Sequence, residues 1–144
     1  LKGFGEIMKW RFFADKQVYS GLEESALPAV KPLTAEFINS HDNFISWLGQ
    51  ASVIIKSKGS VILVDPVLGE IPFFKKRRTQ SALAYDHASR IAGTLTVLLA
   101  HNHYDHLDTR SIKSMPAGAK YIVPAGLGKT MKKLGAIDVT EMDW

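Results

Sequence analysis

The 144-residue sequence contains no cysteine. Without thiolates the chain can form neither a disulfide framework nor a cysteine-ligated zinc site, so any metal has to be held by histidine, aspartate or glutamate. No apolar run approaches the ~18 residues that a membrane-spanning helix requires. Histidine is scarce too, with five in the whole chain, and three of these five lie within six residues.

The composition is that of a soluble globular protein of one domain. Hydrophobic residues make up 46% and charged residues 22%, and the formal net charge of +4 is modest. Lysine and arginine are scattered, except in the run Lys75–Arg78, which is more typical of a solvated surface loop. Because neither interleaved aromatics nor a recognised module accompanies this run, we expect no specific nucleic-acid partner.

Short runs rich in β-branched residues alternate with amphipathic stretches, which favours a layered α/β fold. The expected strands are 44–48, 52–56, 61–64, 94–99, 121–123 and 137–139. The expected helices are 107–115, with Asp108 placed to help its start, and 125–134, with one helical turn within 81–91. Lys58 and Gly59 predict a hairpin turn. The unbroken apolar run Val61–Val64 predicts a strand buried on both faces.

The first forty residues differ from the rest. Residues 1–20 carry a loosely helical aromatic patch that either packs on the protein or lies at a membrane surface. Residues 21–40 include Pro28 and Pro32 and are interpreted as an extended connector. We therefore divide the chain into an N-terminal extension and connector, 1–40, and a domain, 41–144.

Four potential metal ligands follow the strand 94–99 directly: His101, His103, Asp105 and His106. In an extended segment, residues two apart project to one side, so His101 and His103 are expected to converge, with Asp105 and His106 aimed at a second point nearby. Imidazole and carboxylate suit zinc, iron or manganese. His41 and His87 stand alone and are interpreted as ordinary surface or core residues.

The run His-x-His-x-Asp-His resembles the signature of metallo-β-lactamase-fold hydrolases. The flanking motifs resemble, in order, the branch of N-acyl-phosphatidylethanolamine-hydrolysing phospholipase D and its bacterial relatives. These motifs are Trp47–Gly49, Val61–Val67, Ala100–Asp108, Val123–Gly128 and Glu141–Trp144. The resemblance covers about residues 44–144.

The resemblance implies an α/β (α+β) chain that forms the N-terminal half of an αββα metallo-β-lactamase sandwich. It implies two metal ions, zinc or another divalent metal, with His101 and His103 on the first and Asp105 and His106 on the second. Asp105 is also implied near the attacking water, as the catalytic residue. Asp65, at a strand end, either supports the site through a hydrogen bond or serves ordinary turn chemistry before Pro66.

Two departures from the family stand out. Gln50 occupies the position after the first turn glycine where relatives usually carry histidine. The family also takes a further histidine, a bridging aspartate and a last histidine from beyond the aspartate-tryptophan motif, whereas this sequence ends at Trp144. We therefore expect a domain truncated at the C-terminus, with only two ligands per metal.

Two hypotheses of different classes follow. The first is a metal-dependent hydrolase that acts on a phosphodiester or lipid-type substrate and makes weak contact with a membrane surface. Its location stays open between the cytoplasm and the periphery of a membrane. The alternative is a catalytically inactive fragment that acts as a folding or interaction module and pairs through an exposed sheet as a homo-oligomer. Single-metal storage or sensing is a third reading that no specific feature supports.

Overall fold

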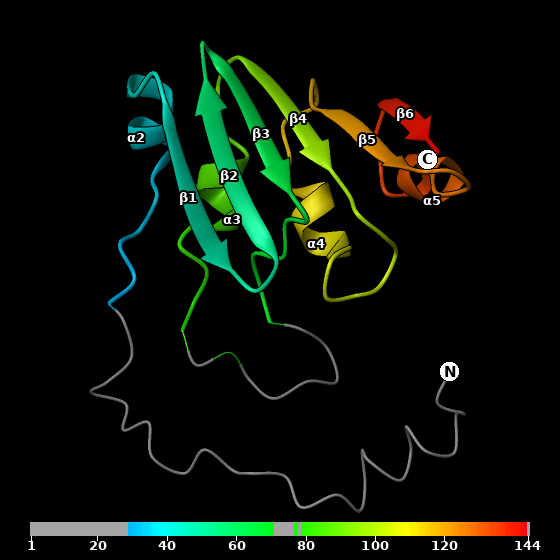
Figure 1. Ribbon diagram of the computed structural model, residues 1–144, viewed down its shortest axis with the longest axis horizontal. Coiled ribbons are helices and arrows are strands. Elements are labelled where there is room, and N and C mark those ends of the chain that lie inside the picture. The colour runs from blue at the N-terminus through cyan, green and yellow to red at the C-terminus, as the bar shows by residue number, and fades with distance from the viewer. Residues whose placement is uncertain (1–28, 71–76, 78, 144) are drawn as a thin grey trace, which may run out of the picture.

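The order of the strands in the sheet follows their order along the chain. The computed structural model describes residues 29–70, 77 and 79–143, and the predictions for residues 1–28 lie outside this part. The strands, in the sheet order β1-β2-β3-β4-β5-β6, are Phe44–Gly49, Ser52–Ser57, Ser60–Val64, Thr94–Leu98, Lys120–Pro124 and Asp138–Met142. The helices are α2 (Ala35–Ser40), α3 (Tyr85–Ala88), α4 (Thr109–Lys113) and α5 (Gly128–Lys133) (Figure 1).

The sheet is antiparallel in its first half and parallel in its second. β1, β2 and β3 pair as antiparallel neighbours, and β3, β4, β5 and β6 pair in parallel. Lys58 and Gly59 have φ values of 48° and 79°, as the type I′ hairpin turn between β2 and β3 requires, so the predicted turn is confirmed. The carboxyl ends of the parallel strands meet at one edge of the sheet, where α/β proteins place their sites.

The helices cover one face of the sheet. Each helix contributes a buried residue (Ile38, Ala88, Ile112 and Met131) to one apolar cluster with the inward-facing residues of the strands. The alternate residues of β3, β4 and β5 are only partly buried. The prediction that Val61–Val64 is buried on both faces is therefore wrong, because no described helix or strand covers the second face. None of the helices in the described ranges is long and apolar enough to cross a membrane.

The interpretation of residues 21–40 as an extended connector fails at its end, because Ala35–Ser40 form α2. The hydroxyl of Thr34 accepts the backbone N–H of Phe37, which caps the helix start. At the other end the buried Lys56 ammonium donates to the carbonyls of Ile38 and Asn39. Prolines favoured an extended segment, but this cap and the burial of Ile38 decide the local structure.

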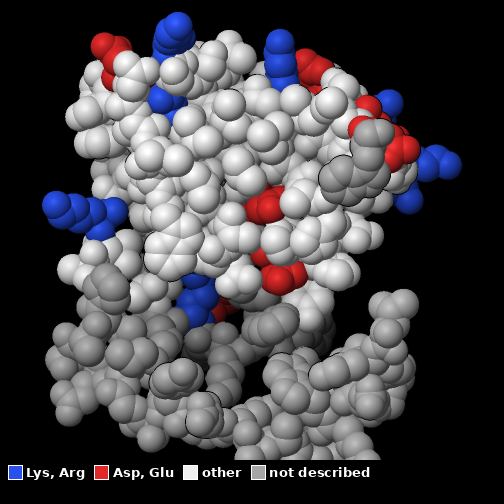
Figure 2. Space-filling view, viewed as in Figure 1, with Lys and Arg blue, Asp and Glu red and all other residues white. Residues whose placement is uncertain are grey.

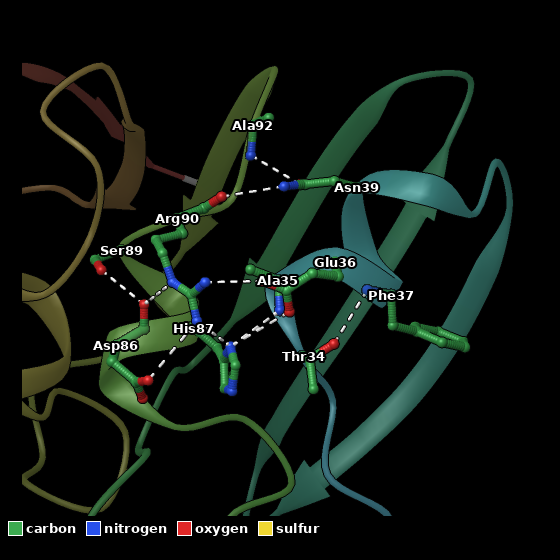
Figure 3. Close-up of polar contacts among 10 residues, drawn as sticks. All are labelled: Thr34, Ala35, Glu36, Phe37, Asn39, Asp86, His87, Ser89, Arg90 and Ala92. Carbon is green, nitrogen blue, oxygen red and sulfur yellow. Dashed lines mark hydrogen bonds and ion pairs between the residues drawn. The ribbon is translucent and has the colours of Figure 1, made fainter.

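A polar network ties α2 to α3 (Figure 3). The carboxylate of Glu36 pairs with the guanidinium of Arg90 at 2.8 Å. His87 Nδ1 accepts the backbone N–H of Ala35 at 3.2 Å and lies 2.7 Å from the Arg90 guanidinium. The side chain of Asn39 donates to the Arg90 carbonyl and accepts the N–H of Ala92. Segments more than fifty residues apart are thereby held together, and residues 35–40 pack as part of the folded unit.

The remaining helices and strands lie where the sequence predicts them, but their lengths differ from the predicted ones. α3 lies within the predicted helical turn of 81–91, α4 within 107–115 and α5 within 125–134. The last strand is longer than expected and runs to Met142. Helix ends fray or tighten into turns, so such boundaries shift by a few residues.

Candidate metal centre

The cluster lies in the loop between β4 and α4, at the carboxyl edge of the parallel strands (Figure 1). The loop is a turn and not the extended segment that the spacing suggested, because the N–H groups of His106 and Leu107 both donate to the His103 carbonyl, at 2.9 and 2.7 Å. Asp108 then caps α4 by accepting the N–H groups of Arg110 and Ser111. The predicted role of Asp108 at the helix start is confirmed.

Three of the four predicted ligands converge. His101, His103 and Asp105 each offer one ligand atom, and these atoms lie within 4.8 Å of one another. His101 and Asp105 are half-buried, whereas His103 is exposed. The rings of His101 and His103 meet edge to face, with centroids 4.7 Å apart. Across the described residues, no hydrogen bond reaches the ring nitrogens of these two histidines.

His106 is placed differently. Its Nδ1 lies 2.8 Å from Oδ2 of Asp65, and its Nε2 lies 3.8 Å from Oδ2 of Asp105. A carboxylate on one imidazole nitrogen fixes the tautomer that presents the other nitrogen as a ligand. His106 is therefore oriented with Nε2 towards the cluster. Its assignment to a second metal stays a prediction.

Asp65 connects the cluster to the sheet. Its side chain is 5% exposed, and its second carboxylate oxygen accepts the N–H of Ala100 at 2.7 Å. Its φ of 42° lies in the left-handed region, which aspartate tolerates better than most residues. The hydroxyl of Ser52 donates to the Asp65 carbonyl at 2.7 Å and accepts the N–H of Val67 at 2.9 Å. Nothing in the sequence pointed to Ser52, because its partners are 13 and 15 residues away.

A second network holds the far end of the loop. Oδ2 of Asp108 accepts the hydroxyl of Ser111 at 2.6 Å and that of Tyr85 at 3.2 Å. Burial, and then the Asp108 carboxylate, raise the pKa of Tyr85. The Ser111 hydroxyl in turn accepts the N–H of Leu68. Both ends of the metal loop are thus tied to the segment that follows β3, an arrangement without a local sequence signal.

The donor set fits a divalent metal ion. Zinc binds histidine nitrogen and carboxylate oxygen at about 2.0–2.2 Å, so two ligand atoms on one ion lie at most about 4.4 Å apart. The ligand atoms of His101, His103 and Asp105 lie within 4.8 Å of one another, which is close to this limit. Two imidazoles and a carboxylate also suit iron and manganese.

Comparison with known proteins identifies the family. A profile of the "Beta-lactamase superfamily domain" matches residues 44–142. The chain belongs to the beta-lactamase superfamily. A relative from Caenorhabditis elegans, named N-acyl-phosphatidylethanolamine-hydrolyzing phospholipase D 1, is 30% identical over 145 residues that cover 91% of this chain and 38% of that protein. A UPF0173 metal-dependent hydrolase of Azorhizobium caulinodans is 38% identical over 84 residues, 56% of this chain and 32% of that protein.

A solved structure shares the superfamily fold. CmlA, a diiron β-hydroxylase from Streptomyces venezuelae, has a TM-score of 0.50 at 24% identity, over 72% of this chain and 21% of CmlA. At this identity the likeness concerns the fold alone. The chain spans between about a fifth and two fifths of the length of these relatives.

These findings confirm the α/β fold and the family resemblance predicted from the sequence. The superfamily includes proteins named as metal-dependent hydrolases, and the donor set supports a metal cofactor. These names do not fix the identity of the metal, since CmlA is a diiron enzyme. Gln50 lies in the β1–β2 turn with a φ of 54°.

Proposed function

We propose that this chain carries the metal-binding half of a zinc-dependent hydrolase that acts on a phosphodiester or lipid-type substrate. The observation that supports the proposal is the convergence of three ligand atoms from His101, His103 and Asp105, without hydrogen-bond partners at the two histidines among the described residues. Relatives named as a phospholipase D and as a metal-dependent hydrolase favour the reaction class.

A zinc ion bound here would supply Lewis acidity, which lowers the pKa of a water molecule towards neutrality and polarises a phosphoryl or carbonyl oxygen. The residues of the chain have separate roles around it. His101 and His103 would hold the ion, and Asp105 would bind it and orient the attacking water. Asp65 would keep His106 in the tautomer that presents Nε2. By resemblance to the family, the complete site would hold two ions.

The substrate class is tested by activity and metal content together. Wild-type chain is dialysed against a weak chelator, its zinc is measured by elemental mass spectrometry, and hydrolysis of a chromogenic phosphodiester is followed. We expect the wild type to retain about one zinc per chain and the His101→Ala/His103→Ala variant to retain none. The matched control is His41→Ala/His87→Ala, which removes two other histidines and should retain zinc.

The outcomes separate metal binding from catalysis. Zinc retention by both double variants, or by neither variant nor wild type, would contradict the assigned site. Zinc retention without phosphodiester hydrolysis would reject the substrate class for this chain by itself. Weak, salt-sensitive binding to anionic vesicles also stays a prediction, which vesicle sedimentation at low salt tests.

A further inference from the structure

The metal loop, residues 99–108, lies between β4 and α4 and is held at its two ends. The ring nitrogens of His101 and His103 meet no hydrogen-bond partner within the described part of the chain. The positions of these ligands therefore depend on the residues that hold the ends of the loop. At the first end, the carboxylate of Asp65 accepts the N–H of Ala100 at 2.7 Å. A different set of residues holds the second end.

Asp108 is the last residue of the metal loop and has two kinds of partner. Its carboxylate accepts the N–H groups of Arg110 and Ser111, which caps α4. The hydroxyl of Ser111, a fully buried residue, also donates to it at 2.6 Å. The other donor is the hydroxyl of Tyr85, the first residue of α3, at 3.2 Å. The bonds from α4 belong to the helix start, whereas the Tyr85 hydroxyl joins the loop end directly to a different element.

The side chain of Tyr85 is itself held in place. The guanidinium of Arg110 lies over its ring, 4.5 Å from the ring centroid. Its hydroxyl lies so close to Gly69 that a Cβ added there would collide with the hydroxyl oxygen. α3 is in turn fixed to α2 by the polar network of Figure 3. Glycine at position 69 therefore permits the bond from Tyr85 to Asp108, and the packed helices give that bond a firm base.

We propose that Tyr85 is a positioning residue for the metal site, which acts through Asp108 on the loop that carries Asp105. Loss of the hydroxyl leaves the cap of α4 in place, because Asp108 and its backbone donors are retained. It frees the second end of the loop, and ligands that are not held in advance bind a metal ion less tightly. The proposal rests on the metal-binding function proposed above and adds the residue that sets the orientation of the loop.

The charges around the site explain why the loop needs this second attachment. Figure 2 shows acidic side chains in the middle of the view, whereas most Lys and Arg side chains lie towards its margins. Carboxylate oxygens of Asp65 and Asp105 lie 2.8 and 3.8 Å from the two ring nitrogens of His106. Like charges repel at such short range. Before a cation binds, this repulsion favours movement of Asp105 away from the site, and the attachment of the loop end opposes that movement.

The first test compares two tyrosines by isothermal titration of the full 144-residue chain with zinc. Tyr85→Phe removes only the hydroxyl and should weaken zinc binding about fivefold, because the net contribution of one hydrogen bond corresponds to about that factor. Tyr121→Phe is the matched control, since the Tyr121 hydroxyl donates to the Ile112 carbonyl of α4 at 3.5 Å and not to the loop. It should bind zinc like the wild type. With cobalt in place of zinc, the visible spectrum should change in Tyr85→Phe alone.

Gly69→Ala gives an independent route to the same displacement. Its Cβ would push the Tyr85 hydroxyl off Asp108, so this change should also weaken zinc binding about fivefold. Combining Gly69→Ala with Tyr85→Phe should weaken binding little further, because both changes break the same bond. Gly118→Ala is the matched control, because a Cβ there meets nothing within 4 Å. Losses that multiply in the double variant would contradict the proposal.

Hydrogen exchange of the metal-free chain tests the same role without zinc. The N–H groups of His106 and Leu107 bond to the His103 carbonyl within the loop. The N–H of Leu99 bonds instead to a carbonyl of β5 in the sheet. Tyr85→Phe should speed exchange at the two loop groups several-fold and leave Leu99 unchanged. Equal acceleration at all three positions would show a general loss of stability and would contradict a positioning role.

The outcomes keep the two proposals apart. A wild-type chain that takes up no zinc contradicts the proposed function, and the exchange rates then decide the role of Tyr85 by themselves. If the wild type binds zinc, an unchanged affinity in Tyr85→Phe overturns the positioning role. An equal loss in Tyr121→Phe overturns it too, because any missing hydroxyl at α4 would then have the same effect. Circular dichroism of each variant checks that the fold persists.

Discussion

His87 and the pair His101 and His103 show two uses of the same side chain. His87 Nδ1 accepts the N–H of Ala35 and lies 2.7 Å from the guanidinium of Arg90, so it joins two helices. The nitrogens of His101 and His103 meet no hydrogen-bond partner in the described part of the chain, yet they converge with Asp105. The Nδ1 atom of His87 is used within the fold, whereas the ring nitrogens of His101 and His103 converge with a carboxylate and are arranged for a ligand.

The largest expected effect is the stabilisation of the fold by zinc bound at His101 and His103. Zinc at about 100 times its dissociation constant should stabilise the wild type by about 2.7 kcal/mol, because it binds only the folded state. For a domain of this size that corresponds to a rise in Tm of about 10 °C. His101→Ala/His103→Ala should show no rise, as measured by differential scanning calorimetry with and without zinc. An equal rise in this variant would mean that the metal binds elsewhere.

His106 combines both uses, and its partner Asp65 can be changed. Asp65→Asn keeps the shape but replaces the anionic acceptor that faces His106 Nδ1 at 2.8 Å. Loss of such a partner lowers metal affinity by about 10- to 100-fold. Isothermal titration with zinc measures this change. Asp86→Asn, at an exposed carboxylate on α3, is the control and should leave the affinity unchanged.

Substitutions of His87 should change the stability of the fold and leave the zinc affinity unaltered. His87→Ala removes the acceptor of the Ala35 N–H, which should lower the free energy of unfolding by about 1 kcal/mol. His87→Asn places an amide oxygen near the position of Nδ1 and should recover part of that loss. Urea denaturation measures both, and zinc titration should find neither variant altered. A change in zinc affinity would break the distinction between the two kinds of histidine.

The smallest expected effect concerns a carboxylate, Glu141, whose contribution to stability should depend on pH. Glu141 accepts the N–H groups of Gly126 and Gly128 at 2.8 and 2.6 Å, which hold its pKa below the ordinary 4.5. Because the folded state has the lower pKa, this contribution is present above pH 4.5 and is lost as the pH falls through the folded pKa.

Urea denaturation of wild type and Glu141→Gln across this range provides the measurement. The stability difference between them should shrink as the pH falls below 4.5. A difference that stays constant with pH would show that the carboxylate charge contributes nothing.

The strands and the ligand run could be predicted because their signals are local. Runs of β-branched residues predicted β2, β3 and β4, and Asp108 predicted the start of α4. The convergence of His101 and His103 was also expected, although a turn and not an extended segment produces it. Local pattern was sufficient where neighbours in sequence are neighbours in space.

Features that depend on contacts between distant residues could not be predicted from the sequence. α2 was missed because its six residues are stabilised by Thr34, Lys56 and the distant Arg90, against the prolines before it. Burial of both faces of Val61–Val64 was wrong, since an apolar run does not reveal whether a second layer is present. The hydroxyl of Ser52 joins Asp65 and Val67 across a gap that no periodicity describes.

The hydrogen bonds of Asp65 have a kinetic consequence. They join it to Ala100 and His106 across 35 and 41 residues of chain, and its own N–H bonds to Leu98 on β4. During refolding, the loop can reach its final orientation only after β3 and β4 have paired. A synthetic peptide with the six residues from His101 to His106 would contain the ligands without that orientation. High-affinity metal uptake would therefore report on the completion of a long-range folding step.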